Sequence, residues 1–131
     1  MGPEPFVACR VLVVDAVPAI ALALRATMRR SGCAVMCADS VAAAEVCLAE
    51  GAYDVVVMDA WLGPAALALC HEIRAGPGAP AVVLTTAYPT SDVLRLVRES
   101  GADACLVKPF ALADLVECVA GLVGQGTGRA P

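Results

Sequence analysis

Residues 55 to 59 read VVVMD, a short run of apolar and mostly β-branched side chains that ends in an acidic residue. The runs VLVV at 11 to 14 and AVVL at 81 to 84 have the same apolar character. None of the three alternates apolar with polar residues, which is typical of strands covered by helices on both faces of a parallel sheet. The sequence therefore predicts an α/β fold built around a buried parallel sheet.

Helical patterns separate the strand-like runs along the chain. We expect strands at 11–14, 34–38, 55–58, 81–85 and 104–107, and helices at 19–30, 41–49, 65–75, 93–100 and 112–123. These five β/α units predict a five-stranded, parallel, doubly wound sheet. The domain is expected to span residues 9–123, between a flexible N-terminus at 1–8 and a flexible Gly-rich tail at 124–131.

The composition narrows the class of protein. A length of 131 residues fits one domain, and 60% hydrophobic with only 17% charged residues excludes a disordered chain. Charged residues interrupt every long apolar stretch, and the N-terminus MGPEPFVACR lacks the pattern of a signal peptide. We therefore expect a soluble, cytoplasmic protein that does not enter a membrane. A formal net charge of −4, without a large cationic cluster, predicts that this chain alone does not bind nucleic acid.

The seven cysteines are odd in number, contain no CxxC motif and mostly fall inside apolar runs. Buried, reduced thiols are the expected state, rather than a metal site or a disulfide framework. The single histidine, His71, excludes a His-ligated zinc site and a catalytic triad that this chain supplies by itself.

Polar residues close four of the predicted strands. The first strand ends in Asp15, the third in Asp59, the fourth in Thr85-Thr86 and the fifth in Lys108-Pro109. Sites in open α/β sheets form at the carboxyl ends of the strands, near the point where the strand order reverses. We therefore expect two carboxylates, a hydroxyl and an ammonium to meet at one edge of the sheet. Lys108 is the only lysine in the chain.

Such a set of side chains suits phosphoryl transfer to a carboxylate. Asp59 can attack a phosphoryl donor, while Mg²⁺ prefers carboxylate, carbonyl and water oxygens. Lys108 would then neutralise the phosphoryl group, and a threonine hydroxyl would donate to another of its oxygens. Simpler alternatives stay open, because an Asp after a strand also serves as a turn or cap residue and a lysine there also occurs in solvent. A dinucleotide-binding enzyme is disfavoured, since no GxGxxG follows the first strand.

The segments VLVVDAVPAI, YDVVVMDAWLGP, VVLTTAY and GADACLVKPF resemble, in this order, the signature segments of response-regulator receiver domains of two-component systems. The resemblance implies a flavodoxin-like receiver fold with Asp59 as the phospho-accepting residue. By the same resemblance Asp15, Asp59 and the backbone carbonyl of Trp61 look like the Mg²⁺ site. Thr86 looks like the switch hydroxyl, with Thr85 as its rival. Lys108 looks like the contact to the phosphoryl group, with a cis bond to Pro109.

The chain also departs from the receiver pattern. The resemblance implies further acids after Asp15, but Ala16 and Val17 follow, so one direct metal ligand is missing and Mg²⁺ binding should be weak. The loop DAWLGP is shorter, with Gly and Pro transposed. Cys105 replaces the aromatic residue three positions before Lys108 that turns inward on activation.

Two functions from different classes follow. In the first, the protein is a receiver that takes a phosphoryl group from a histidine kinase or phosphotransfer protein and signals to a target protein or effector domain. It would be no enzyme for a small substrate, although it would assist its own phosphorylation and dephosphorylation. In the second, it is a pseudo-receiver that docks a partner without phosphorylation. Redox sensing through Cys105 is a weaker third idea. The sequence leaves open the cognate partners and the oligomeric state, a homodimer included.

Overall fold

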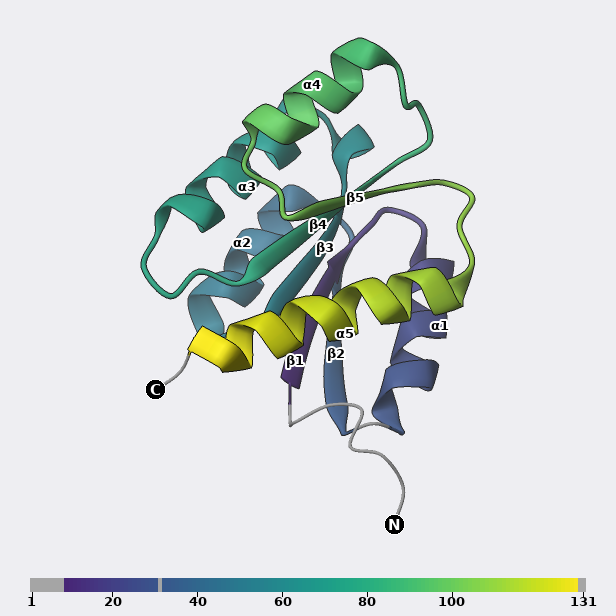
Figure 1. Ribbon diagram of the computed structural model, residues 1–131, viewed down its shortest axis with the longest axis vertical. Helices are drawn as coiled ribbons and strands as arrows, with labels where there is room; N and C mark the ends of the chain where they lie inside the picture. Colours follow the sequence, from purple (N-terminus) through teal and green to yellow (C-terminus); the bar gives the residue numbers. More distant parts are fainter. Residues whose placement is uncertain (1–8, 31, 130–131) are drawn as a thin grey trace.

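A five-stranded parallel sheet forms the centre of the computed structural model, which describes residues 9–30 and 32–129 (Figure 1). Its strands are β1 (Cys9–Val14), β2 (Cys33–Ala38), β3 (Val55–Asp59), β4 (Ala81–Thr86) and β5 (Ala104–Val107). They lie in the order β2-β1-β3-β4-β5, so the chain first winds outward from β1 to β2 and then returns to the other side through β3. This arrangement confirms the predicted doubly wound sheet.

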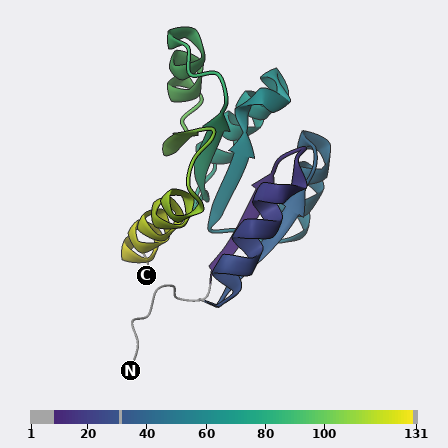
Figure 2. The same cartoon turned by 90° about the vertical axis from the view of Figure 1, so that its right-hand side faces the viewer.

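Helices cover both faces of the sheet. They are α1 (Pro18–Arg29), α2 (Val41–Glu50), α3 (Pro64–Ala75), α4 (Ser91–Glu99) and α5 (Leu112–Arg129), with a short 3₁₀ turn η1 (Ala60–Leu62) before α3. Buried side chains of α1 and α5 pack on one face, and those of α2, α3 and α4 pack on the other. In the side view of Figure 2, α5 and α2 lie on opposite sides of the sheet.

Alternate strand residues supply two separate cores. In β1, Val11 and Val13 face α1 and α5, whereas Leu12 and Val14 face the opposite helices. All four side chains are almost fully buried. Burial of each such side chain contributes about 1.5–3 kcal/mol relative to exposure, so both faces of the strand must be apolar. This two-sided burial explains why the strand segments contain no polar alternation.

Capping residues, a glycine and a proline determine where α2, α3 and α4 begin. Ser40 and Thr90 each accept a hydrogen bond from the backbone N–H three residues on, at 3.1 Å and 3.2 Å, and so cap α2 and α4. Gly63 has a φ of 104°, a conformation that favours glycine, and lets the chain turn from η1 into α3. Pro64 then occupies the first turn of α3, where its missing N–H is no loss.

The last helix runs further than the sequence predicts. α5 continues to Arg129, whereas the helical pattern predicted an end at residue 123. The flexibility of the tail at 124–131 stays a prediction. Glycine lowers helix propensity without forbidding helical angles, so a helix already formed can propagate through it. The N-terminus predicted to be flexible, residues 1–8, lies outside the described residues. No helix in the described ranges combines the length and the apolarity that crossing a bilayer requires.

Cys9 and Cys33 form a disulfide between β1 and β2, so the prediction of reduced thiols throughout is wrong for this pair. The parallel register places the two residues side by side, with their Cα atoms 4.8 Å apart. They are 24 residues apart in sequence, and only the strand order makes them neighbours. The other five cysteines are free.

We predict that iodoacetamide modifies five cysteines when protein purified without reductant is denatured, and all seven after reduction with dithiothreitol. Mass spectrometry of the intact chain counts the added groups. Reduction should also lower the free energy of unfolding by about 3 kcal/mol, because the disulfide restricts the unfolded chain. Seven modified cysteines without reductant would show that the pair is not bonded.

Candidate functional site

The carboxyl edge of the sheet collects the polar residues that close the strands. Asp15 directly follows β1, Asp59 ends β3, and Thr85 and Thr86 end β4. Lys108 directly follows β5, and its backbone N–H donates to the Thr86 carbonyl at 2.7 Å. The parallel register also pairs Asp59 with Thr85. The strand order therefore brings residues that are up to 93 positions apart to one edge.

Lys108 bridges the two carboxylates. Its Nζ lies 2.9 Å from Asp15 Oδ2 and 3.4 Å from Asp59 Oδ2. The side chains are largely shielded from solvent, with exposed fractions of 4% for Asp15, 14% for Asp59 and 21% for Lys108. Shielding from water strengthens the attraction between these charges. Three of the residues singled out from the sequence thus form one charged cluster.

Each carboxylate is also oriented by a backbone amide two residues further on. The Val17 N–H donates to Asp15 Oδ1 at 2.8 Å, and the Trp61 N–H donates to Asp59 Oδ1 at 2.9 Å. Each carboxylate therefore directs one oxygen to its own loop and the other to Lys108. Because two hydrogen-bonding groups hold each carboxylate, both have a defined orientation before any ligand arrives.

The Lys108 ammonium is held in its charged form. Burial alone would lower its pKa, but the hydrogen bond and charge of Asp15, with the charge and hydrogen bond of Asp59, raise the pKa above the ordinary lysine value. The peptide bond from Lys108 to Pro109 is cis, as the sequence predicted. By pairing with two carboxylates, Lys108 neutralises part of the negative charge that the strand ends bring together.

The two threonines at the end of β4 differ in their hydrogen bonds. The Thr86 hydroxyl accepts from the Tyr88 N–H at 3.0 Å, while the Thr85 hydroxyl has no hydrogen-bond partner among the described residues. Both side chains are buried. An unpaired buried hydroxyl costs about 1–3 kcal/mol. The backbone carbonyl of Thr86 accepts from the Lys108 N–H, but the Thr86 hydroxyl makes no hydrogen bond to Asp59.

Tyr88 was not singled out from the sequence, yet it links two parts of the site. Its amide holds Thr86, as the Trp61 amide holds Asp59, and each donor comes two residues after its acceptor. The rings of Trp61 and Tyr88 lie 4.4 Å apart between centroids, at an angle of 36°. The equal spacing after Asp59 and Thr86 was the signal that could have identified Tyr88. The aromatic pair therefore spans the loops that follow β3 and β4.

Cys105 lies in β5 and packs, half-buried, against the core under α2, α3 and α4. Burial raises the pKa of its thiol, which disfavours the reactive thiolate. The structure thus gives little support to redox sensing at this position.

The carboxyl edge of the sheet offers few protein oxygens to a metal ion. Asp15 and Asp59 each direct an oxygen to the same nitrogen of Lys108, so their carboxylates converge on one point, as a shared cation requires. Within the described ranges, however, no three His, Cys, Asp or Glu side chains are grouped to hold a metal. Ala16 stands where a further acid was expected. The residues fit a Mg²⁺ ion that keeps most of its water ligands.

Known proteins resemble this chain in sequence and in fold. The chain matches the profile of the response regulator receiver domain over residues 11–120. It is 36% identical over 108 residues to the DNA-binding response regulator MtrA of Mycolicibacterium smegmatis, a match that covers 82% of this chain and 47% of MtrA. It is 35% identical over 117 residues to the virulence sensor protein BvgS of Bordetella pertussis, covering 83% of this chain and 10% of BvgS.

A solved structure agrees with these sequence matches. The crystal structure of a response regulator from Thermotoga maritima superposes with a TM-score of 0.81 and 27% identity, covering 90% of this chain and 99% of that one. The chain spans about half the length of MtrA and a tenth of BvgS.

We predict that the pKa of Lys108 in the folded protein exceeds that in urea-unfolded protein, and that Asp15→Asn lowers it. Because the folded value is raised, the ion pairs stabilise fully below the unfolded pKa, and this stabilisation is lost as the pH rises through the folded pKa. Lys108 is the only lysine, so reductive methylation with ¹³C-formaldehyde labels it and the N-terminal amine alone. An NMR titration follows both signals.

Asp39→Asn is the matched control for this titration. Asp39 follows β2 at the same edge of the sheet but is outside the ion pairs of Lys108. Its replacement should leave the Lys108 pKa within experimental error. Equal effects of the two substitutions would contradict the bridge.

Proposed function

Because the chain belongs to the response regulator receiver domain family, we propose that it accepts a phosphoryl group on Asp59 and signals through a change in its own conformation. The observation that carries this proposal is the Lys108 ammonium, held 3.4 Å from Asp59 Oδ2 at the carboxyl edge of the sheet. Lysine at this distance can pair with a phosphoryl oxygen on Asp59 as readily as with the carboxylate itself.

The proposed donor is a phosphohistidine of a histidine kinase or phosphotransfer protein. An Asp59 carboxylate oxygen attacks phosphorus, a P–O bond forms as the P–N bond breaks, and the electron pair leaves with the partner's imidazole. The one histidine of this chain, His71, is exposed on α3 and has no role in the step. The Trp61 amide holds Asp59 Oδ1 and so fixes the orientation of the carboxylate for attack.

Receiver domains bind Mg²⁺ at this acidic edge. In this chain Asp15, Asp59 and the Trp61 carbonyl would hold the ion, and when bound it supplies positive charge for the phosphoryl oxygens. Ala16 provides no ligand, so we infer weak Mg²⁺ affinity. A larger share of the charge compensation then falls to Lys108.

We place the conformational response at the end of β4 and on the neighbouring α4 and β5. The Thr86 hydroxyl accepts from Tyr88 but keeps its own proton, which it could donate to a phosphoryl group on Asp59. A shift of Thr86 toward Asp59 would pull on the Tyr88 loop and on α4, whose N-cap is Thr90. Cys105 would move less than an aromatic residue there. A target protein or effector domain in the cytoplasm would bind this altered face.

We expect acetyl phosphate with Mg²⁺ to add one phosphoryl group to the protein, and Asp59→Asn to abolish the addition. Intact-mass spectrometry measures the product, and hydroxylamine should remove it because acyl phosphates react with this nucleophile. Asp54 is a second carboxylate next to β3, at the end opposite Asp59. Asp54→Asn is therefore the control, and this variant should still be phosphorylated. Absence of the product even at high Mg²⁺ would favour the docking module without phosphorylation.

Ala16→Asp should tighten Mg²⁺ binding on the order of tenfold, because it adds a carboxylate next to Asp15. Ala16 borders a cavity of about 420 Å³ that Asp15 and Asp39 also line, so the longer side chain has room. A Mg²⁺ titration followed by the fluorescence of Trp61, the only tryptophan, gives the dissociation constant.

Ala26→Asp adds the same charge at an exposed position of α1 and should leave the Mg²⁺ affinity unchanged. If both variants bind Mg²⁺ equally, the gain reflects net charge and not a restored ligand.

A further inference from the structure

We propose that the cavity between α3 and α4 is a binding site for a small, flat, uncharged aromatic molecule. The cavity has a volume of about 580 Å³, within the range of about 300–1,000 Å³ that small-molecule sites occupy. It opens next to the end of β4, on the side of the sheet away from α1 and α5. The proposal concerns binding to the unphosphorylated protein and does not depend on phosphorylation of Asp59.

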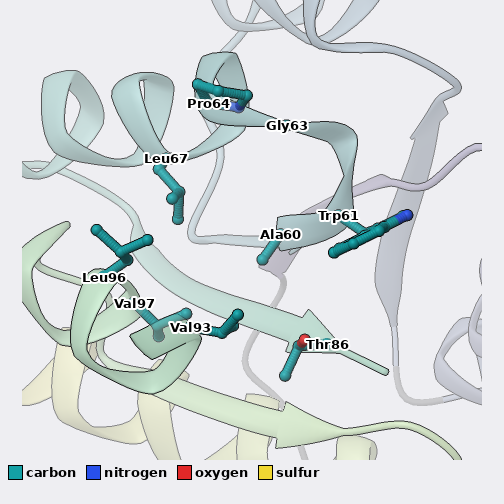
Figure 3. Close-up of a pocket in the computed structure, with 9 residues that line it drawn as sticks. All are labelled: Ala60, Trp61, Gly63, Pro64, Leu67, Thr86, Val93, Leu96 and Val97. Atoms are coloured by element: carbon teal, nitrogen blue, oxygen red, sulfur yellow. The ribbon is translucent and has the colours of Figure 1, made fainter. Parts of the chain in front are cut away.

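The walls of the cavity are apolar. Figure 3 shows Leu67 from α3 and Leu96 and Val97 from α4 pointing into the space between the two helices. None of the described residues that line the cavity carries a charge. A charged ligand would lose its hydration here without gaining a partner, so the lining selects an uncharged one.

One buried hydroxyl provides a polar anchor. Thr86 lines the cavity with its side chain fully buried, and its oxygen already accepts from the Tyr88 N–H. The hydroxyl proton remains available for an acceptor atom on the ligand. A carbonyl or ring nitrogen at one end of the ligand suits this position.

An aromatic surface stands at the edge of the cavity. Trp61 borders the cavity and is 64% exposed, and its ring contacts the tilted ring of Tyr88, which is 52% exposed. Two exposed aromatic rings in contact offer a face that a flat aromatic ligand can cover, because aromatic rings favour offset or edge-to-face contacts with one another. The ring system of the ligand would therefore lie toward Trp61.

On α4, charged residues lie beside the apolar residues that line the cavity. On α4, Val93, Leu96 and Val97 face the cavity at helical spacing, whereas the neighbouring Asp92 and Arg95 are exposed and form an ion pair at 3.8 Å. A docked helix or a second copy of the chain would need an apolar strip that continues along the helix. The three cavity-lining residues of α4 form a short patch, which fits a small molecule better.

The experiment uses the full chain and the neutral probe 6-propionyl-2-(dimethylamino)naphthalene, whose carbonyl can accept from Thr86. We expect saturable 1:1 binding with blue-shifted probe emission and quenching of Trp61 by energy transfer to the probe. Leu96→Glu should weaken binding at least about tenfold, because it places a charge in the apolar wall. The sulfonated dye 8-anilinonaphthalene-1-sulfonate, which carries a charge, should likewise bind at least about tenfold more weakly.

Leu22→Glu is the matched control, since Leu22 is 55% exposed on α1 and outside the cavity. It should bind the neutral probe as the unaltered protein does, and circular dichroism checks that both variants keep their fold. Absence of saturable binding, or equal weakening by both substitutions, would overturn the proposal. A dimer that Leu96→Glu converts to a monomer would assign the cavity to a second copy of the chain instead.

Discussion

The pairing of one ammonium with two carboxylates is the interaction on which the carboxyl edge of the sheet depends. Parallel strands of the order β2-β1-β3-β4-β5 force the ends of β1 and β3 together, and both ends are acidic. Two shielded carboxylates at one place repel each other. Lys108, 2.9 Å and 3.4 Å from their oxygens, removes this conflict. The fifth strand therefore completes the site electrostatically as well as completing the sheet.

Much of this arrangement could be predicted from sequence, because it follows from strictly local patterns. Runs without polar alternation identify buried strands, and a residue that closes a strand lies at the edge whatever the exact bounds are. Asp15, Asp59 and Lys108 meet as expected for that reason. The Cys9–Cys33 disulfide could not be inferred, since it depends on β1 and β2 being neighbours in register. The length of α5 was also missed, because the glycines after Val123 indicate a helix end only on average.

The loops after β3 and β4 share a design that the sequence only hinted at. Trp61 and Tyr88 each use the backbone to hold a side chain of the edge, Asp59 or Thr86, and use the ring to contact each other. Asp59 and Thr86 are therefore connected through these two amides and the ring contact. Because Thr86 and Trp61 also line the cavity between α3 and α4, the proposed phosphorylation of Asp59 and the proposed ligand in the cavity would act on the same two residues. Coupling of this kind is reciprocal in its free energy.

The replacement of an acid by Ala16 changes the charge balance at the edge. With Asp15, Asp59 and Lys108 alone, the cluster carries one net negative charge, and a third carboxylate would have made it two. A phosphoryl group adds further negative charge, so a site with three acids requires a metal ion more strongly than this one does. Under the proposed function, the missing ligand would weaken Mg²⁺ binding and at the same time reduce the requirement for the ion. Lys108 can then supply a larger part of the compensation than in a fully acidic site, provided that it stays charged, and the raised pKa ensures this.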